Sequence, residues 1–104
     1  MFNIKDLMQQ AQGMQQRIAE MREDLAARTV RGSAGGDMVR VEANGAQEIL
    51  SVKIEESVLT SGDAELVEDL IVAAVNDALA RSRELVEQEM AKLTGGLRIP
   101  GLMG

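Results

Sequence analysis

The segment from Ala64 to Leu93 constrains this chain most, because it contains neither glycine nor proline and consists mainly of Ala, Leu, Glu and other good helix formers. At about 1.5 Å per residue it predicts a single helix of roughly 45 Å. Apolar residues cover a wide face up to Ala80 and only a narrow stripe after it. We therefore expect the first half of this helix to pack on a sheet and on a second partner, and the second half to project as an arm.

The whole helix, with its caps, is predicted over residues 61–94. Ser61 is the expected N-cap, and Asp63 and Glu65 would lie in the first turn, where carboxylates interact favourably with the helix dipole. Gly95 and Gly96 would supply a left-handed C-cap. The tail, residues 95–104, is apolar and interrupted by Gly and Pro. It leaves two alternatives, a tail docked in a groove and a disordered tail.

A second helix, over residues 1–26, is predicted by apolar residues that recur every three or four positions from Ile4 to Leu25. This spacing is that of a heptad a/d seam, so the helix should lie along another helix of the same chain or of a second copy. Asn3 is its expected N-cap. The polar face is rich in Gln rather than Lys or Arg, which argues against a helix lying on a lipid surface.

Between these helices, residues 27–55 alternate with a period of two and predict three short antiparallel strands in a meander. Asn44-Gly45 is a strong signal for the second hairpin. A tight turn at Gly35-Gly36 would form the first hairpin and would place Arg31 opposite Arg40, where two like charges repel. The predicted fold class is therefore α+β, in the order α-β-β-β-α.

The third strand would point its side chains to two different surfaces. Its inward residues would be Leu50, Val52 and Ile54, and its outward residues would be Ile49, Ser51 and Lys53. Lys53 would then share the outer face of the sheet with Arg31 and Arg40. Two interpretations remain open: an anion binds these three cations, or carboxylates of Glu42, Glu48 or a partner subunit neutralise them.

The length of 104 residues and the composition predict one domain that gains stability by oligomerising. The chain has 45% hydrophobic residues but a single aromatic one, Phe2, to fill a core. It has no apolar run of the roughly 18 residues that span a membrane, and its N-terminus lacks the apolar region of a signal peptide. We expect a cytoplasmic protein that does not bind membranes.

The residue types that dominate catalytic sites are missing. The chain has no Cys and no His, which excludes the common zinc, Ser-His-Asp and Cys-His constellations. Its carboxylate pairs fall on exposed helix faces or at a strand end, where nothing buries them to perturb a pKa. We therefore predict no catalytic residue, no metal ligand, no cofactor and no small-molecule substrate, and the protein is expected not to be an enzyme.

The net charge of −6 is unevenly distributed, because residues 1–54 are balanced and residues 55–104 carry the acidic excess. A polyanion would have to bind a local basic face, with strong sensitivity to salt. A single aromatic residue gives no platform for stacking bases. If the partner is a nucleic acid, Arg and Lys should contact duplex phosphates and read little sequence.

Four segments together resemble the YbaB/EbfC family of bacterial nucleoid-associated proteins. They are GSAGG (32–36), LSVKI (50–54), EDLIVAAVNDAL (68–79) and the GGL…PGL tail (95–102). The resemblance implies a small, tweezer-like homodimer in which a helix, three antiparallel strands and a long helix form each subunit. It also implies binding of duplex DNA, a change in DNA conformation, and a role in nucleoid organisation and gene regulation.

The same resemblance associates DNA contacts with the two helical arms, which carry Arg17, Arg22 and Arg28 on the first and Arg81, Arg83 and Lys92 on the second. With the sheet face added, the candidate DNA-binding residues are Arg17, Arg22, Arg28, Arg31, Arg40, Lys53, Arg81 and Arg83. The candidate residues for helix packing in the core or a dimer are Leu7, Met14, Ile18, Met21, Leu25, Leu70, Ile71, Val75 and Leu79.

A competing hypothesis is a dimeric adaptor that is not an enzyme. In that case the heptad arm and the apolar tail would grip another protein, with a link to DNA repair or recombination. A titration with duplex DNA separates the two hypotheses.

Overall fold

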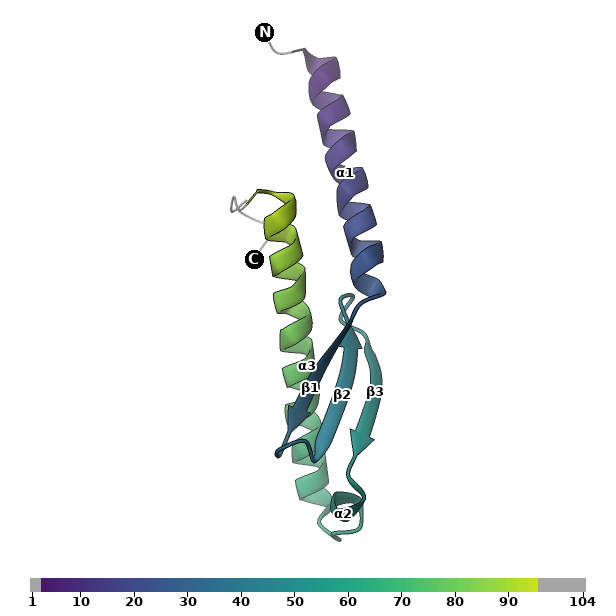
Figure 1. Ribbon diagram of the computed structural model, residues 1–104, viewed down its shortest axis with the longest axis vertical. Helices are drawn as coiled ribbons and strands as arrows, with labels where there is room; N and C mark the ends of the chain where they lie inside the picture. The colour runs from purple at the N-terminus through teal and green to yellow at the C-terminus, as the bar shows by residue number, and fades with distance from the viewer. Residues whose placement is uncertain (1–2, 96–104) are drawn as a thin grey trace.

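The computed structural model describes residues 3–95 and confirms the α+β class and the α-β-β-β-α order (Figure 1). The elements are α1 (Ile4–Ala26), β1 (Thr29–Ala34), β2 (Val39–Asn44), β3 (Ile49–Ile54), α2 (Glu56–Leu59) and α3 (Ala64–Leu93). The short helix α2 lies in the stretch that was expected to be a plain connector. The expectations for the tail fall on residues 96–104 and lie outside the described residues.

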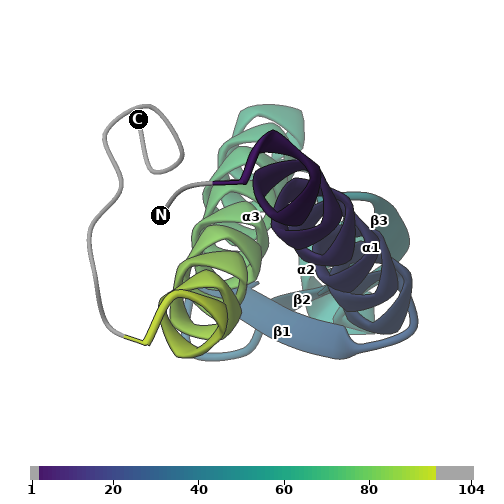
Figure 2. The ribbon, with the colours of Figure 1, turned by 90° about the horizontal axis from the view of Figure 1, so that it is seen from above.

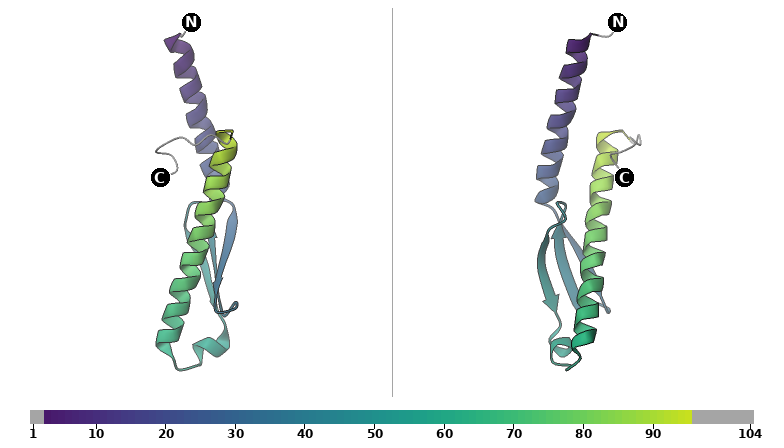
Figure 3. Two further views of the ribbon diagram at one scale, coloured as in Figure 1. Left: turned by 90° about the vertical axis from the view of Figure 1, so that its left-hand side faces the viewer. Right: turned by 180° about the vertical axis from the view of Figure 1, so that it is seen from behind.

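The strands form one antiparallel sheet in the order β1-β2-β3, and α3 runs along one face of it (Figure 3). Both α1 and the C-terminal part of α3 extend beyond the same end of the sheet (Figure 1). The radius of gyration is 19.2 Å, whereas a compact domain of this size has about 13 Å. The chain is therefore a slender body with two projecting helices.

The core lies between β2 and the first half of α3. Val39, Val41 and Ala43 of β2 pack with Ala74 and Ala78 of α3, and all five are almost completely buried. Partly buried neighbours complete this core: Val30, Ala34, Ile54, Leu70, Ile71 and Val75. Of the predicted packing residues on α3, Leu70, Ile71 and Val75 thus contact the core, and Leu79 is half-buried.

Close approach of α3 to β1 depends on small residues. Ala74, Ala78 and Ser82 occur at every fourth position of α3, and each is fully buried. Ala74 and Ala78 face Gly32 of β1, where a Cβ would lie 2.7 Å from the carbonyl oxygen of Ala74. No larger residue fits at this position unless the helix moves away from the strand.

The predicted helix ends are partly confirmed. Asn3 caps α1, because its side-chain oxygen accepts a hydrogen bond from the amide of Lys5 at 3.0 Å. Gly95 follows α3 with φ of +67°, as a left-handed C-cap requires. Ser61, however, is not the N-cap of α3: Asp63 is, and its carboxylate accepts from the amide of Leu66 at 3.0 Å.

The predicted register of the first hairpin is wrong by two residues. Ala34 pairs with Val39 rather than with Asp37, because the turn contains four residues, 35–38. Gly35, Gly36 and Asp37 all have positive φ in this turn, at 64°, 62° and 72°. As a result Arg31 lies opposite Glu42, not opposite Arg40. The predicted repulsion between two arginines is replaced by an ion pair.

The second hairpin turns at Asn44-Gly45 as predicted. The Asn44 side-chain oxygen accepts hydrogen bonds from the amides of Ala46 and Glu48, each at 3.0 Å, and Ser82 donates to the Asn44 carbonyl at 2.7 Å. These bonds satisfy a polar residue that is only 5% exposed. They also anchor the hairpin to α3.

Alternation along β3 is interrupted by a bulge. Ser51 pairs with Glu42, but the next pair joins Ile49 to Ala43, so that Leu50 is the additional residue. Ile49 therefore lies opposite an inward-facing residue, contrary to the expectation that it points outward. Val52 lies opposite the inward-facing Val41, as predicted, but α3 covers β1 and β2 rather than β3. Val52 therefore remains 42% exposed, and the bulged Leu50, also expected to be inward, is 53% exposed.

The helix α1 leaves most of its apolar seam open. Leu25 is its one buried residue in the described part of the chain, Met14, Ile18 and Met21 are half-buried, and Leu7 is 44% exposed. Viewed from above, α1 and α3 run as two separate columns (Figure 2). At its base, α1 is joined to the second hairpin, since the amide of Gly45 donates to the Leu25 carbonyl at 2.9 Å.

Candidate nucleic-acid interface

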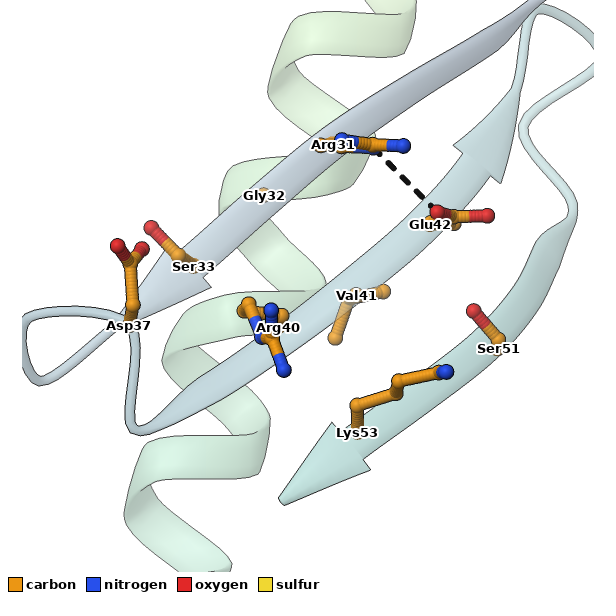
Figure 4. A pocket seen from close by; sticks show the side chains of 9 residues that line it. All are labelled: Arg31, Gly32, Ser33, Asp37, Arg40, Val41, Glu42, Ser51 and Lys53. Carbon is orange, nitrogen blue, oxygen red and sulfur yellow. Dashed lines mark ion pairs between the residues drawn. The ribbon is translucent and has the colours of Figure 1, made fainter. Parts of the chain in front are cut away.

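The outer face of the sheet brings together the three predicted cations Arg31, Arg40 and Lys53, one from each strand (Figure 4). A register error of two residues does not change which face a side chain occupies, so this part of the prediction is correct. The face forms a shallow hollow of about 490 Å³. Its lining consists of Arg31, Gly32, Ser33, Asp37, Arg40, Val41, Glu42, Ser51 and Lys53.

Two of these three cations have no carboxylate partner in residues 3–95. Arg31 pairs with Glu42 at 3.3 Å, and its side chain is 82% exposed. Arg40 lies directly opposite Lys53, and neither makes an ion pair within the described chain. Because like charges directly opposite on two strands are destabilising, this pair favours an anion.

Of the two carboxylates expected to neutralise this face, Glu42 does so and Glu48 does not. The Glu48 carboxylate accepts a hydrogen bond from the Asn44 amide group at 2.9 Å, at the hairpin. The hollow therefore retains an excess of positive charge, and its serines, Ser33 and Ser51, offer hydroxyl groups beside the cations. Cations and hydroxyl groups of this kind are the usual contacts to phosphate oxygens.

Three cations of the arms are engaged in ion pairs. Arg28 and Lys92 both pair with one oxygen of Glu89, at 3.0 Å and 3.1 Å. The hydrogen bond from Arg28, followed by that from Lys92, lowers the pKa of the Glu89 carboxyl below its ordinary value. Arg81 pairs with Asp77 at 3.3 Å.

Asp77 connects α3 with β1 as well as holding Arg81. Its carboxylate accepts a hydrogen bond from the backbone amide of Ser33 at 2.9 Å. This backbone hydrogen bond is the largest cause of a lowered pKa at Asp77, and Arg81 lowers the pKa further. Asp77 is thus a structural carboxylate that also fixes the position of one candidate cation.

Arg17 and Arg22 of α1 and Arg83 of α3 are exposed and make no ion pair with any residue in 3–95. The candidate cations therefore divide into an unpaired group and a paired group. The unpaired group comprises Arg17, Arg22, Arg40, Lys53 and Arg83; the paired group comprises Arg28, Arg31, Arg81 and Lys92.

Sequence reasoning missed the role of Glu89. Ion pairs within a helix can be recognised from spacings of three or four residues, and Lys92–Glu89 and Arg81–Asp77 are of this kind. The bond from Arg28 to Glu89 joins residues 61 positions apart and leaves no such signal. It is visible only once the base of α1 lies beside α3.

No group of three or more Asp, Glu, His or Cys residues in positions 3–95 is placed to hold a metal ion. Within the same residues, no helix has the length and apolar character needed to cross a bilayer. The geometry defines a small α+β protein with an exposed basic face and two helical arms.

The chain belongs to the YbaB/EbfC DNA-binding family, whose model matches residues 1–97. Similar proteins in two bacteria are named nucleoid-associated proteins. A nucleoid-associated protein of Syntrophobacter fumaroxidans is 55% identical over 95 residues, covering 91% of this chain and 86% of the relative. A nucleoid-associated protein of Thermoanaerobacter pseudethanolicus is 50% identical over 101 residues, covering 97% and 91%.

The fold has a counterpart among solved structures. The crystal structure of the uncharacterized protein HP0035 from Helicobacter pylori superimposes with a TM-score of 0.81 and covers 91% of this chain and all of its own. At 23% identity this likeness concerns the fold alone. It agrees with the αβββα arrangement that the sequence predicted.

Proposed function

We propose that this protein is a cytoplasmic, nucleoid-associated protein that binds duplex DNA as a homodimer with little sequence specificity and alters its conformation. The observation that carries the proposal is the outer face of the sheet, where Arg40 and Lys53 lie opposite one another without carboxylate partners in residues 3–95. Family membership and the names of the relatives support DNA as the anion. Contributions to nucleoid organisation and gene regulation follow from such binding.

Weak sequence preference is inferred from the kind of contact available. The candidate residues are Arg and Lys side chains on the outer face of the sheet and on exposed helix surfaces. Such cations contact the sugar-phosphate backbone, which carries no sequence information. Binding should therefore be similar for unrelated duplexes and should weaken steeply with salt.

A homodimer is supported by apolar residues that the single chain leaves uncovered. On β3, Ile49, Leu50 and Val52 are 40–53% exposed, and on α3 Val72 is 60% exposed. The strand β3 is also an edge of the sheet, with backbone groups available for pairing. A second copy that covers these residues would complete a core that is small for a chain of this length.

The alternative function, a protein-interaction adaptor, is favoured by one feature, the tip of α1. Ile4, Leu7 and Met8 are 75%, 44% and 59% exposed near the free end of this arm. An apolar helix face of this kind can dock in a groove of another protein. The adaptor remains the second candidate because the unpaired cations would have no role in it.

A mobility-shift titration tests the proposed function. Two duplexes of unrelated sequence should bind with similar affinity at low salt, and the logarithm of the affinity should fall linearly with the logarithm of the salt concentration. If no shift occurs at roughly tens of micromolar protein in low salt, DNA binding is excluded and the adaptor is the remaining candidate, since non-specific binding normally falls in that concentration range.

Single substitutions on the sheet face locate the contact. Arg40→Gln or Lys53→Gln should each reduce the salt slope by about 0.9, the value for one lost phosphate contact. The matched control is Ser57→Glu, which changes the net charge by the same amount at an exposed position on α2. If the slope is unchanged in both sheet variants, this face does not contact DNA, and the arms are the remaining candidate surface.

The homodimer has its own test. Val52→Glu should shift the mass measured by light scattering from dimer towards monomer, because it places a charge on the uncovered apolar side of β3. Ser51→Glu, one residue earlier and on the outer face, is the control that should leave the mass unchanged. A wild-type monomer at micromolar concentration would contradict the homodimer.

A further inference from the structure

Two cations from different parts of the chain meet at one oxygen atom. Glu89 Oε1 accepts a hydrogen bond from an Arg28 guanidinium nitrogen at 3.0 Å and from Lys92 Nζ at 3.1 Å. Arg28 follows the end of α1, whereas Lys92 lies in the last turn of α3. The fold therefore places a cation from the base of one arm beside a cation from the other arm, with a carboxylate between them.

A hollow of about 420 Å³ lies next to this group, between the two arms. It is lined by Arg17, Glu20, Met21, Asp24, Glu89, Lys92 and Leu93. The formal charges of the hollow and of Arg28 sum to zero, because Arg17, Arg28 and Lys92 are matched in number by the carboxylates of Glu20, Asp24 and Glu89. Removing the charge of Glu89 alone would make the region cationic.

Both cations can be reached from solvent. The side chains of Arg28 and Lys92 are 45% and 73% exposed, while that of Glu89 is 20% exposed. Carboxylate and phosphate oxygens accept the same charge-assisted hydrogen bonds from Arg and Lys. Because Glu89 already holds both cations, a phosphate group can contact them only by displacing this carboxylate.

We infer that Arg28 and Lys92 form a phosphate-binding site that spans the two arms, and that Glu89 occupies this site in the free protein as an internal competitor for DNA. The inference rests on the proposed function, because the phosphate is that of a duplex backbone. It assigns to an acidic residue the task of limiting affinity.

Glu89→Gln tests the inference, with Glu87→Gln as the matched control. Both remove one negative charge from the same part of α3, but Glu87 is exposed and makes no ion pair with residues 3–95. Glu89→Gln should increase the salt slope of duplex binding by about 1.8, for two cations released, and should raise affinity at low salt about tenfold. Glu87→Gln should leave the slope unchanged.

The Arg28–Glu89 pair also ties α1 to α3, so freed cations must be distinguished from a freed arm. Arg28→Gln breaks the same tie and removes the cation. It should not raise affinity in the wild-type background, and it should cancel about half of the gain in the slope when combined with Glu89→Gln. A rise in affinity with Arg28→Gln alone would show that opening of the arms, not release of cations, is responsible.

The results separate this inference from the proposed function. If the wild type and Glu87→Gln bind duplex DNA and Glu89→Gln has the same slope as Glu87→Gln, the internal competitor is refuted and DNA binding stands. If neither the wild type nor Glu89→Gln binds duplex DNA at low salt, both proposals are refuted. Circular dichroism and light scattering are the controls that each variant keeps the fold and the mass of the wild type.

Discussion

The layer formed by the sheet and α3 differs from α1 in how it is held. In the layer, β2 and α3 contribute five almost fully buried apolar residues that contact one another within the single chain. In α1, 23 residues contribute one buried side chain, Leu25. The layer is therefore stabilised by its own packing, whereas the arm depends on helix propensity, a contact at its base and whatever covers its apolar seam.

Two glycines illustrate the difference in packing between the layer and α1. Gly32 of β1 is buried, and a Cβ there would approach backbone atoms of α3 at Ala74 and Ala78. Gly13 of α1 has no neighbouring atom within 4 Å of an added Cβ. One glycine is required by packing, and the other is a weak point in an exposed helix.

The largest expected effect is that of Gly32→Ala. The added methyl group meets backbone rather than a flexible side chain, so α3 must move away from β1 and the core must loosen. We expect a loss of about 3 kcal/mol in the free energy of unfolding, measured by urea denaturation at a fixed protein concentration. Gly13→Ala is the matched control and should instead stabilise α1 by up to about 1 kcal/mol.

A loss below about 1 kcal/mol for Gly32→Ala would mean that α3 is less tightly fixed on the sheet than the packing indicates. Stabilisation of similar size in both variants would remove the distinction between the layer and the arm. Retention of the helical signal in circular dichroism distinguishes a shift of α3 from unfolding.

The second prediction concerns the base of the arm. Leu25→Ala should cost about 2 kcal/mol, near the lower end for a buried leucine, because a hollow of 320 Å³ already adjoins this side chain. Leu7→Ala, in the exposed part of the seam, should change stability by less than about 0.5 kcal/mol. Thermal unfolding at two protein concentrations measures both variants.

If Leu7→Ala proves as costly as Leu25→Ala, and more so at the lower protein concentration, the seam is covered in the assembled protein. The arm would then resemble the layer, with the difference that a second copy provides its packing. Equal and small effects for both variants would instead show that Leu25 does not fix the base of α1.

The smallest expected effect is that of Asp77→Asn on the pH dependence of stability. The folded protein lowers the pKa of this carboxyl from its ordinary value of 3.8, so the carboxylate stabilises the fold above that value and this contribution disappears as the pH falls through the lowered pKa. The side chain is 35% exposed, which limits the effect to less than about 1 kcal/mol.

Urea denaturation between about pH 2 and 6 should therefore show a shallower decline for Asp77→Asn than for the wild type. Asp69→Asn, another exposed acid of α3 that makes no ion pair within residues 3–95, is the control. Parallel profiles for all three proteins would show that the bond from Ser33 to Asp77 does not couple α3 to β1 in solution.

Much of the fold could be predicted from the sequence, because the two helices and three strands are marked by clear periodicities. The register of the first hairpin could not, since Asp37 extends the turn by adopting a positive φ that few non-glycine residues tolerate. Nor could the bulge at Leu50. Both are details of turn length and strand pairing, which the alternation of side chains along the chain does not report.

Part of the candidate site could also be predicted from the sequence. The face shared by Arg31, Arg40 and Lys53 followed from alternation alone and survived the error in register. Which cations have partners did not follow, because the pairs from Arg31 to Glu42 and from Arg28 to Glu89 depend on cross-strand and cross-helix geometry. The pairs within α3, Arg81–Asp77 and Lys92–Glu89, are of the kind that spacing along a helix can indicate.

The hydrogen bond from the Gly45 amide to the Leu25 carbonyl joins the β2–β3 turn directly to the base of α1. A Cβ on Gly45 would lie 2.6 Å from that carbonyl oxygen, so the turn and the base of α1 are packed too closely to move independently. The helix α1 has 23 residues, so at 1.5 Å per residue it is about 35 Å long. A slight rotation of the hairpin, whose outer strand is the edge β3, would therefore swing the far tip of α1 through several times the displacement at its root.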